Sequence, residues 1–265
     1  MVSSPTGHNI LYIRRIQVGE VFDKNNETRI ETSIEKSSTK ALNINAKLTI
    51  KQMIKKYSVL ICIVISVILL VIATLFYPGG SLLDKNSIGF DWSKNFISNL
   101  FLAKALNGSE NTSRIWAIIG MAFHAVGYGL FFINMSKKIP SRNAAIILKY
   151  IGAANIVFIF LIATPLHDIM VIISSTLSLL GLFYITVFIL KTKLHLFKFC
   201  CIICLLIFYY TLYLFGTGNW GLLAIMQKVT FTCSMLLVLG LEYFTKQADF
   251  KQIKLRRQKI QATNG

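Results

Sequence analysis

Residues 57–77 read YSVLICIVISVILLVIATLFY, and residues 78–100 continue with PGGSLLDKNSIGFDWSKNFISNL. The first stretch is apolar over about 20 residues, the length that an α-helix needs to cross the hydrocarbon core of a bilayer. The second stretch opens with Pro78-Gly79-Gly80, which stops a helix and favours a turn. Acids, amides, hydroxyls and aromatic residues follow. Together the two stretches predict a membrane span that leads into an ordered polar segment.

The composition of the whole chain is that of a membrane protein. Of its 265 residues, 54% are hydrophobic and 15% are charged, and the mean hydropathy is +0.61, which is too apolar for an ordinary soluble domain. The net charge of +17 comes largely from basic residues between apolar runs and at the two ends. Such residues orient spans and contact anionic headgroups. We therefore expect membrane lipids as partners and no nucleic acid, because the sequence shows no nucleic-acid-binding module.

Six apolar runs have the approximate length of a membrane span. They cover residues 57–77, 115–134, 144–164, 169–190, 199–215 and 225–244. The fifth run is the shortest, and its three tyrosines suit a membrane interface. The sequence thus predicts an all-α polytopic membrane protein with six transmembrane helices and a structured non-cytoplasmic loop between helices 1 and 2. No internal repeat is visible, so an inverted-repeat transporter is not indicated.

The polar ends divide the chain into three parts. Residues 1–52 form a polar N-terminal extension without the apolar core of a signal peptide, and we expect it to be disordered or to lie upstream of a natural start near Met53. Residues 53–244 form the six-helix transmembrane domain. Residues 245–265 form a basic cytoplasmic tail.

Basic residues gather in alternate connections between the spans. These residues are Lys51, Lys55, Lys56, Lys137, Lys138, Arg142, Lys191, Lys193, Lys198 and the basic residues of the stretch 246–259. Connections rich in Lys and Arg face the cytoplasm. Both termini are therefore predicted to be cytoplasmic in a multi-pass protein of a bacterial cell membrane, with residues 78–114 on the opposite side.

The sequence offers little support for cofactor chemistry. All five cysteines lie within predicted spans, where they cannot form a secreted disulfide framework. A metal site would need more ligands than the residues near the cysteines supply. The sequence contains no Gly-rich phosphate loop, no HExxH and no GxSxG. We therefore expect no cofactor and no metal.

Five polar residues are candidates for catalysis because they fall in connections on the predicted non-cytoplasmic side. They are Asp84, Asp91, Ser98, His167 and Asp168. If these side chains converged above the spans, they would supply the general acid and base of a lipid-directed hydrolase. The arrangement contains no obvious nucleophile or metal-ligand set.

Four further residues are candidates for ligand binding, namely Asn95, His124, Asn155 and Lys228. Polar groups inside a membrane are costly, so each is a functional candidate by default. His124 shares a helical face with two glycines, so it either packs closely and bonds Asn155, or marks the path of a proton-coupled carrier. Lys228 alternatively forms an ion pair with Asp168. Lys149 and Glu242 are expected to extend to the cytoplasmic surface.

Several short motifs resemble an uncharacterised family of six-span prokaryotic membrane proteins, a domain of unknown function. They are Tyr77-Pro78-Gly79-Gly80, Asp84, Gly89, Asn95-Phe96-x-Ser98-x-Leu100, Thr164-Pro165 and Gln227-Lys228. The resemblance covers residues 53–244 and implies a fold and a location but no activity. Relatives carry a histidine inside the fourth span, where this chain has Ile173, Ser174 and Ser175.

Three hypotheses follow from these residues. The first is a non-enzymatic membrane protein whose outward face binds a lipid or another apolar ligand. The second is the lipid-directed hydrolase, and the third is a small transporter or proton-coupled carrier. The oligomeric state does not follow from the sequence.

Overall fold

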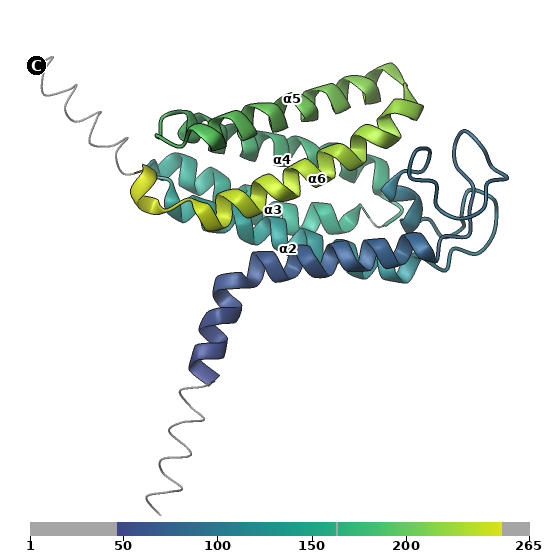
Figure 1. Ribbon diagram of the computed structural model, residues 1–265, viewed down its shortest axis with the longest axis horizontal. Helices are drawn as coiled ribbons and strands as arrows, with labels where there is room; N and C mark the ends of the chain where they lie inside the picture. Colours follow the sequence, from purple (N-terminus) through teal and green to yellow (C-terminus); the bar gives the residue numbers. More distant parts are fainter. Residues whose placement is uncertain (1–46, 163, 251–265) are drawn as a thin grey trace, which may run out of the picture. The chain divides into compact units, whose positions relative to one another are not determined.

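The computed structural model describes residues 47–162 and 164–250, which belong to two compact units, Met1–Lys56 and Tyr57–Gly265. Within the first unit only residues 47–56 are described, and they are helical. Most of the predicted extension, residues 1–46, lies outside the described residues. The second unit is a helical bundle with an ordered loop at one end (Figure 1).

Six helices are long and apolar enough to cross a membrane, as the sequence predicts. They are Lys47–Leu75, α2 (Arg114–Lys138), α3 (Arg142–Leu161), α4 (His167–Leu190), α5 (His195–Thr217) and α6 (Trp220–Phe244), and the 3-10 helix η1 (Ile97–Phe101) precedes α2. The described residues contain no strand, only two isolated bridges. The all-α polytopic class is therefore confirmed. The fifth span is not the shortest, because α5 has 23 residues and α3 has 20.

Small residues hold the helices close together. A Cβ added to Gly152 of α3 would lie 2.7 Å from the carbonyl oxygen of Gly129 in α2. A Cβ added to Gly181 of α4 would lie 2.5 Å from a ring carbon of Phe132. Glycine lets helix backbones approach where no hydrophobic driving force exists between helices in lipid. Successive helices from α2 onward contact each other, and α6 returns to α2.

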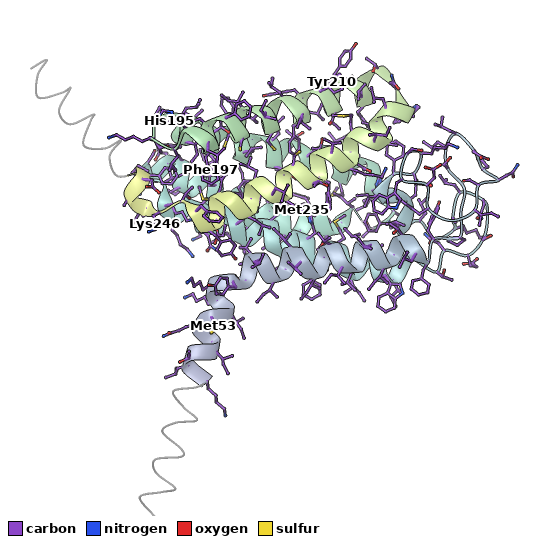
Figure 2. All side chains as sticks on the ribbon, in the orientation of Figure 1. Met53, His195, Phe197, Tyr210, Met235 and Lys246 are labelled. Carbon is purple, nitrogen blue, oxygen red and sulfur yellow. The ribbon has the colours of Figure 1, made fainter. Side chains whose placement is uncertain are left out.

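The outer surface of the bundle is apolar. Leu75 is 77% exposed, Leu206 is 57% exposed and Leu236 is 66% exposed, each on a membrane-length helix. Side chains of this kind on the outside of apolar helices are the surface that lipid tails cover. Figure 2 shows one more such residue, Tyr210, which points away from the bundle on α5.

The connection between the first helix and α2, residues 76–113, is the capping loop. It lies at one end of the bundle, the loop end, whereas His195 and Lys246 lie at the opposite end, the tail end (Figure 2). An antiparallel bridge joins Gly79 to Ile88, and the amide of Gly80 donates to the carbonyl of Ser87 over 2.8 Å. These contacts close residues 79–88 into a small hairpin.

The two glycines of the Tyr77-Pro78-Gly79-Gly80 motif are required by the backbone. Their φ angles are 139° and 83°, in the region that disfavours side chains. A Cβ would also lie 2.2 Å from the carbonyl oxygen of Ser87 for Gly79, and 2.2 Å from the amide nitrogen of Asn107 for Gly80. The hydroxyl of buried Tyr77 donates to Gly80 O and accepts from the amide of Leu106, each over 3.2 Å. The motif thus forms the packed turn that opens the capping loop.

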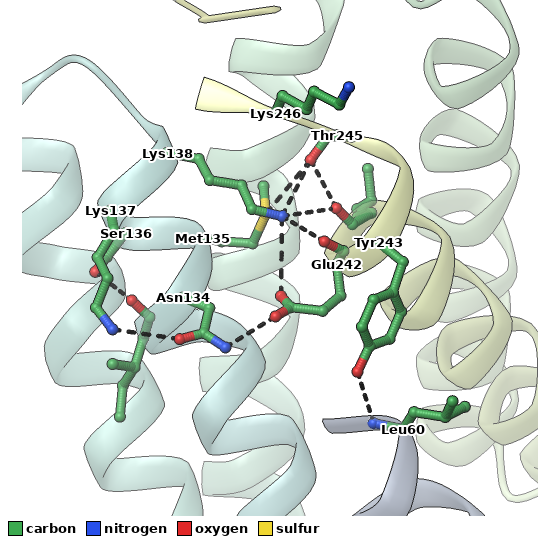
Figure 3. A network of polar contacts seen from close by, with 12 residues as sticks. Leu60, Asn134, Met135, Ser136, Lys137, Lys138, Glu242, Tyr243, Thr245 and Lys246 are labelled. Atoms are coloured by element: carbon green, nitrogen blue, oxygen red, sulfur yellow. Dashed lines mark hydrogen bonds and ion pairs between the residues drawn. The ribbon is translucent and has the colours of Figure 1, made fainter. Parts of the chain in front are cut away.

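A polar network joins α2 to α6 at the tail end (Figure 3). The ammonium of Lys138 donates to the carbonyls of Leu241 and Glu242 over 3.1 and 2.6 Å, which satisfies the end of α6. It also lies 4.0 Å from the Glu242 carboxylate, which accepts a 2.8 Å hydrogen bond from Asn134. The prediction that Glu242 extends to the surface is wrong, because its side chain is 9% exposed. Lys149 is exposed, and its extension to the cytoplasmic surface stays a prediction.

The chain after α6 folds back onto the bundle. Residues 247–250 are helical, Phe250 is fully buried in the main core, and the side-chain amide of Gln247 donates to the carbonyl of Lys137 over 3.2 Å. The first residues of the predicted basic tail therefore belong to the folded domain. The remainder, residues 251–265, lies outside the described residues.

Candidate functional site

Two side chains about two turns into α6 bind the capping loop. The side-chain oxygen of Gln227 accepts a 2.9 Å hydrogen bond from the amide of Ile97, at the first residue of η1. The ammonium of Lys228 donates to the carbonyl of Asn95 and, over 2.7 Å, to the carbonyl of Ala224 in its own helix. The Gln227-Lys228 motif is therefore the attachment point of the loop on the bundle.

Asn95 holds the inside of the loop together. It is fully buried, its amide donates to Gly80 O over 2.6 Å, and its side-chain oxygen accepts from the amide of Asp91 over 2.8 Å. Another buried amide, that of Asn111, donates to the carbonyls of Asn99, Leu100 and Leu102. Buried amides that are paired in this way stabilise a backbone conformation. The proposed ligand-binding role of Asn95 therefore has no support in the geometry.

Two of the three acids in the loop, Asp84 and Asp91, bond to their nearest neighbours. One oxygen of Asp84 accepts from the amide of Asn86 over 3.0 Å. One oxygen of Asp91 accepts from both the hydroxyl and the amide of Ser93, over 2.6 and 2.8 Å, and the other oxygen lies 3.6 Å from Lys94. The Ser93 bonds, more than the Lys94 charge, lower the pKa of Asp91 below its ordinary value. Both carboxylates therefore serve local turns.

The remaining hydrolase candidates lie on separate elements. Ser98 is half-buried in η1, and His167 begins α4. The side chain of Asp168 lies outside the described part of the structure, so the predicted Asp168–Lys228 ion pair stays a prediction. The hydrogen bonds of Asp84 and Asp91 are all made within the loop. The structure therefore gives no geometric support to a shared catalytic group.

His124 lies in an aromatic environment in the middle of α2. It is 5% exposed, its ring stacks on that of Phe231 with 4.5 Å between centroids, and it lies tilted against that of Tyr128 with 4.3 Å between centroids. Tyr128 in turn shares a 2.7 Å hydrogen bond with Ser234 of α6. The expected bond from His124 to Asn155 is not formed, because Asn155 donates to Ser178 of α4 and its side-chain oxygen has no partner among the described residues.

The packing around His124 favours a structural role. A Cβ on Gly120 would lie 3.2 Å from Leu69 and one on Gly127 would lie 3.2 Å from Cys62, so the first helix closes on this face of α2. A carrier would need a polar passage here, and the contacts described for the His124 ring are with the rings of Phe231 and Tyr128. Its Nδ1 atom is nevertheless buried and has no hydrogen-bond partner within the described part of the chain, a feature that the sequence could not show.

The other chemistry-bearing groups do not form a recognisable centre. Among the described residues no three His, Cys, Asp or Glu side chains are grouped so that they could hold a metal ion. Cys201 and Cys204 have the spacing of a C-x-x-C pair but are free thiols, 0% and 3% exposed, in the middle of a membrane-length helix. Reactive cysteines need access to their reaction partners.

Lys228 differs from the other candidates because its side chain places an ammonium group beneath the loop. Its side chain is half-buried, and its ammonium lies 5.8 Å from the centroid of the Phe90 ring. Phe90 contacts buried Tyr77 edge to face at 5.8 Å and the indole of Trp92 at 5.3 Å. Trp92 is 54% exposed. The contacts of Lys228, Phe90, Tyr77 and Trp92 connect the half-buried ammonium to the surface, and we call these four residues the Lys228 row.

Beside this row the loop exposes large apolar side chains. Leu82 is 50% exposed, Leu83 is 61% exposed and Ile88 is 95% exposed. The hairpin that carries them is closed by the Gly79–Ile88 bridge and by a hydrogen bond from the amide of Ser81 to the carbonyl of Asp84 over 2.8 Å. Their exposure is therefore built into an ordered backbone.

The fold and this loop define the class of the protein: it is an α-helical multi-pass membrane protein whose bundle is covered at one end by an ordered loop. No protein-family model, curated protein or solved structure matches the chain.

Proposed function

We propose that this protein is a non-enzymatic multi-pass protein of a bacterial cell membrane whose capping loop faces outward and binds a lipid or another apolar ligand. The exposed leucine and isoleucine side chains on the ordered hairpin carry the proposal. The resemblance to six-span prokaryotic proteins of unknown function is part of the same proposal, because its motifs supply the hairpin turn, the buried Asn95 and the attachment through Gln227 and Lys228.

The physical argument concerns the cost of exposing apolar surface. Hiding such side chains from water is favourable by about 25 cal/mol per Å². A flexible loop would fold them inward, but here glycine turns and paired amides fix residues 79–95. Apolar groups held out of a rigid backbone usually mark a contact surface. Because the loop directly follows a membrane span, lipid is the nearest apolar partner.

Lipid analysis of the purified protein tests the binding. Gentle purification should retain one lipid class above its proportion in the bulk membrane, and Leu83→Ser should lower that retention. Leu206→Ser is the matched control, since Leu206 is 57% exposed on the side of α5 and Leu83 is 61% exposed on the loop. Bulk lipid composition in the wild-type protein would contradict the proposal.

Cysteine labelling tests the orientation. Ser109 in the capping loop and Lys246 at the tail end are both exposed. In intact cells a membrane-impermeant maleimide should label Ser109→Cys and should label Lys246→Cys only after permeabilisation. The reverse pattern would place the loop in the cytoplasm and overturn this part of the proposal.

A further inference from the structure

The ammonium of Lys228 lies closer to the loop end than its position in the sequence indicates. The residue stands two turns into α6, which begins at Trp220. Its side chain extends back along the helix, because its ammonium bonds the carbonyl of Ala224, one turn nearer the loop end, and the carbonyl of Asn95 in the loop. Lysine side chains extend in this way to reach the membrane boundary. The charge is therefore held at the level of the loop.

The contacts described for this ammonium are with uncharged groups. Two of its three N–H groups bond carbonyl oxygens, and the Phe90 ring provides a cation–π contact at 5.8 Å. Among the described residues no carboxylate lies within ion-pair distance of it. Asp91 attracts it from farther away, but Asp91 itself is bonded to Ser93 and faces Lys94.

A half-buried cation that has no counter-ion among the described residues favours an anion beside it. Buried charges are normally paired, because an unpaired charge loses its hydration without compensation. The Lys228 row then leads outward to the half-exposed indole of Trp92. Tryptophan prefers the headgroup level of a bilayer, where one side of the ring is apolar and the other is wet. An anion at Lys228 that carries an apolar part along Trp92 is an anionic lipid.

On these grounds we propose that Lys228 binds the phosphate of an anionic phospholipid headgroup, with Phe90 and Trp92 against its glycerol and upper acyl region. This inference rests on the proposed lipid-binding function and specifies its ligand class. It also assigns Lys228 a second role beside its attachment of the loop.

The experiment compares lipids bound to the delipidated protein after reconstitution with equimolar phosphatidylglycerol and phosphatidylcholine. Non-denaturing mass spectrometry should find phosphatidylglycerol enriched several-fold on the wild-type protein and on Lys228→Arg. In Lys228→Gln the enrichment should fall to the ratio of the bulk mixture. Lys149→Gln, a change at an exposed lysine of α3, should keep the wild-type ratio.

Trp92→Ala provides a second variant, since it removes an exposed ring and no hydrogen bond to the loop backbone. Trp92→Ala should lower phosphatidylglycerol retention. It therefore still tests the site if Lys228→Gln does not fold. Enrichment that is unchanged in both Lys228→Gln and Trp92→Ala would overturn the inference while leaving lipid binding in place. Retention of no lipid above the bulk ratio would overturn the proposed function itself.

Inorganic phosphate distinguishes a lipid headgroup from a free anion. Added to the delipidated wild-type protein, it should leave the melting temperature unchanged, because the apolar part of the ligand is missing. A phosphate-dependent rise in melting temperature that disappears in Lys228→Gln would assign the site to a soluble anion. It would overturn the proposal that the ligand is a phospholipid.

Discussion

At the scale of single residues, the glycines of the capping loop differ in what they do. Gly80 has a φ of 83° and no space for a side chain, whereas Gly89 has a φ of 71° and nothing within 4 Å of an added Cβ. The sequence identifies Gly80 as a turn residue. Only the structure shows that Gly80 is packed against the backbone of residues 106 and 107.

Replacing each of these glycines by alanine distinguishes the cost of backbone strain from the cost of steric overlap. Gly89→Ala should cost roughly 1–2 kcal/mol, the strain of a side chain in the left-handed region. Gly80→Ala should cost more, because the new Cβ would also lie 2.2 Å from the amide nitrogen of Asn107. Limited trypsin digestion at Lys85 and Lys94 measures the opening of the loop. Equal digestion rates in the two variants would contradict the contact.

The Asp91 carboxylate makes the loop sensitive to acid. Because its pKa is lowered in the folded protein, its contribution to stability is complete above the unfolded pKa and is lost as the pH falls through the folded pKa. Ser93→Ala removes the leading hydrogen bond and should raise the pKa of Asp91 toward about 3.9. Carboxyl-carbon NMR titration measures it. Ser109→Ala should leave the midpoint unchanged, and an unchanged midpoint in Ser93→Ala would refute the assignment.

At the scale of secondary-structure elements, the apolar runs predict all six helices because their length and composition are local properties. The ends are predicted less well. The chain turns between α5 and α6 at Gly218, whose φ is 71°, and the side chain of Asn219 caps α6 by accepting from the amide of Leu222. Contacts between helices are not local, and the network at the tail end shows why they escape sequence reasoning.

Lys138 and Glu242 come from helices far apart in the chain, so the sequence shows them only as charged residues near span ends. Lys138→Met should cost about 3–5 kcal/mol of unfolding free energy, since it leaves Glu242 buried and uncompensated. Lys138→Met with Glu242→Gln should cost less than Lys138→Met alone. Denaturant titration in mixed micelles measures both.

Lys137→Met is the control for this pair, because Lys137 is exposed and surface changes usually stay within about 0.5 kcal/mol. A double variant whose loss equals the sum of the two single losses would show that Lys138 and Glu242 act independently.

At the scale of the whole molecule, Phe250 anchors the chain after the last span. It is fully buried, whereas Phe244 at the end of α6 is 74% exposed. Phe250→Ala should lower the unfolding free energy by about 3–5 kcal/mol, and Phe244→Ala should change it little. Thermal unfolding of both variants in the same detergent makes the comparison. Similar melting temperatures would mean that the segment after α6 contributes nothing to the core.

The sequence determined by itself that this is a six-span helical membrane protein with an ordered connection after its first span. Those properties follow from the length and polarity of continuous segments, which need no knowledge of their neighbours. The candidate residues were found as polar groups in unusual places, but their roles were not. Asn95 is a buried amide that bonds the loop backbone, and the His124 ring lies against the rings of Tyr128 and Phe231.

Only the tertiary structure decided what the loop and Lys228 contact. Asn95 and Lys228 are separated by 133 positions, and Lys138 and Glu242 by more than 100, so no local pattern relates the members of either pair. Folding brings them together because a poorly hydrated ammonium is stabilised by hydrogen bonds to oxygen atoms of the packed helices and the loop. Lys228, to which we assign the lipid, is held by carbonyl oxygens and has no counter-ion within ion-pair distance among the described residues.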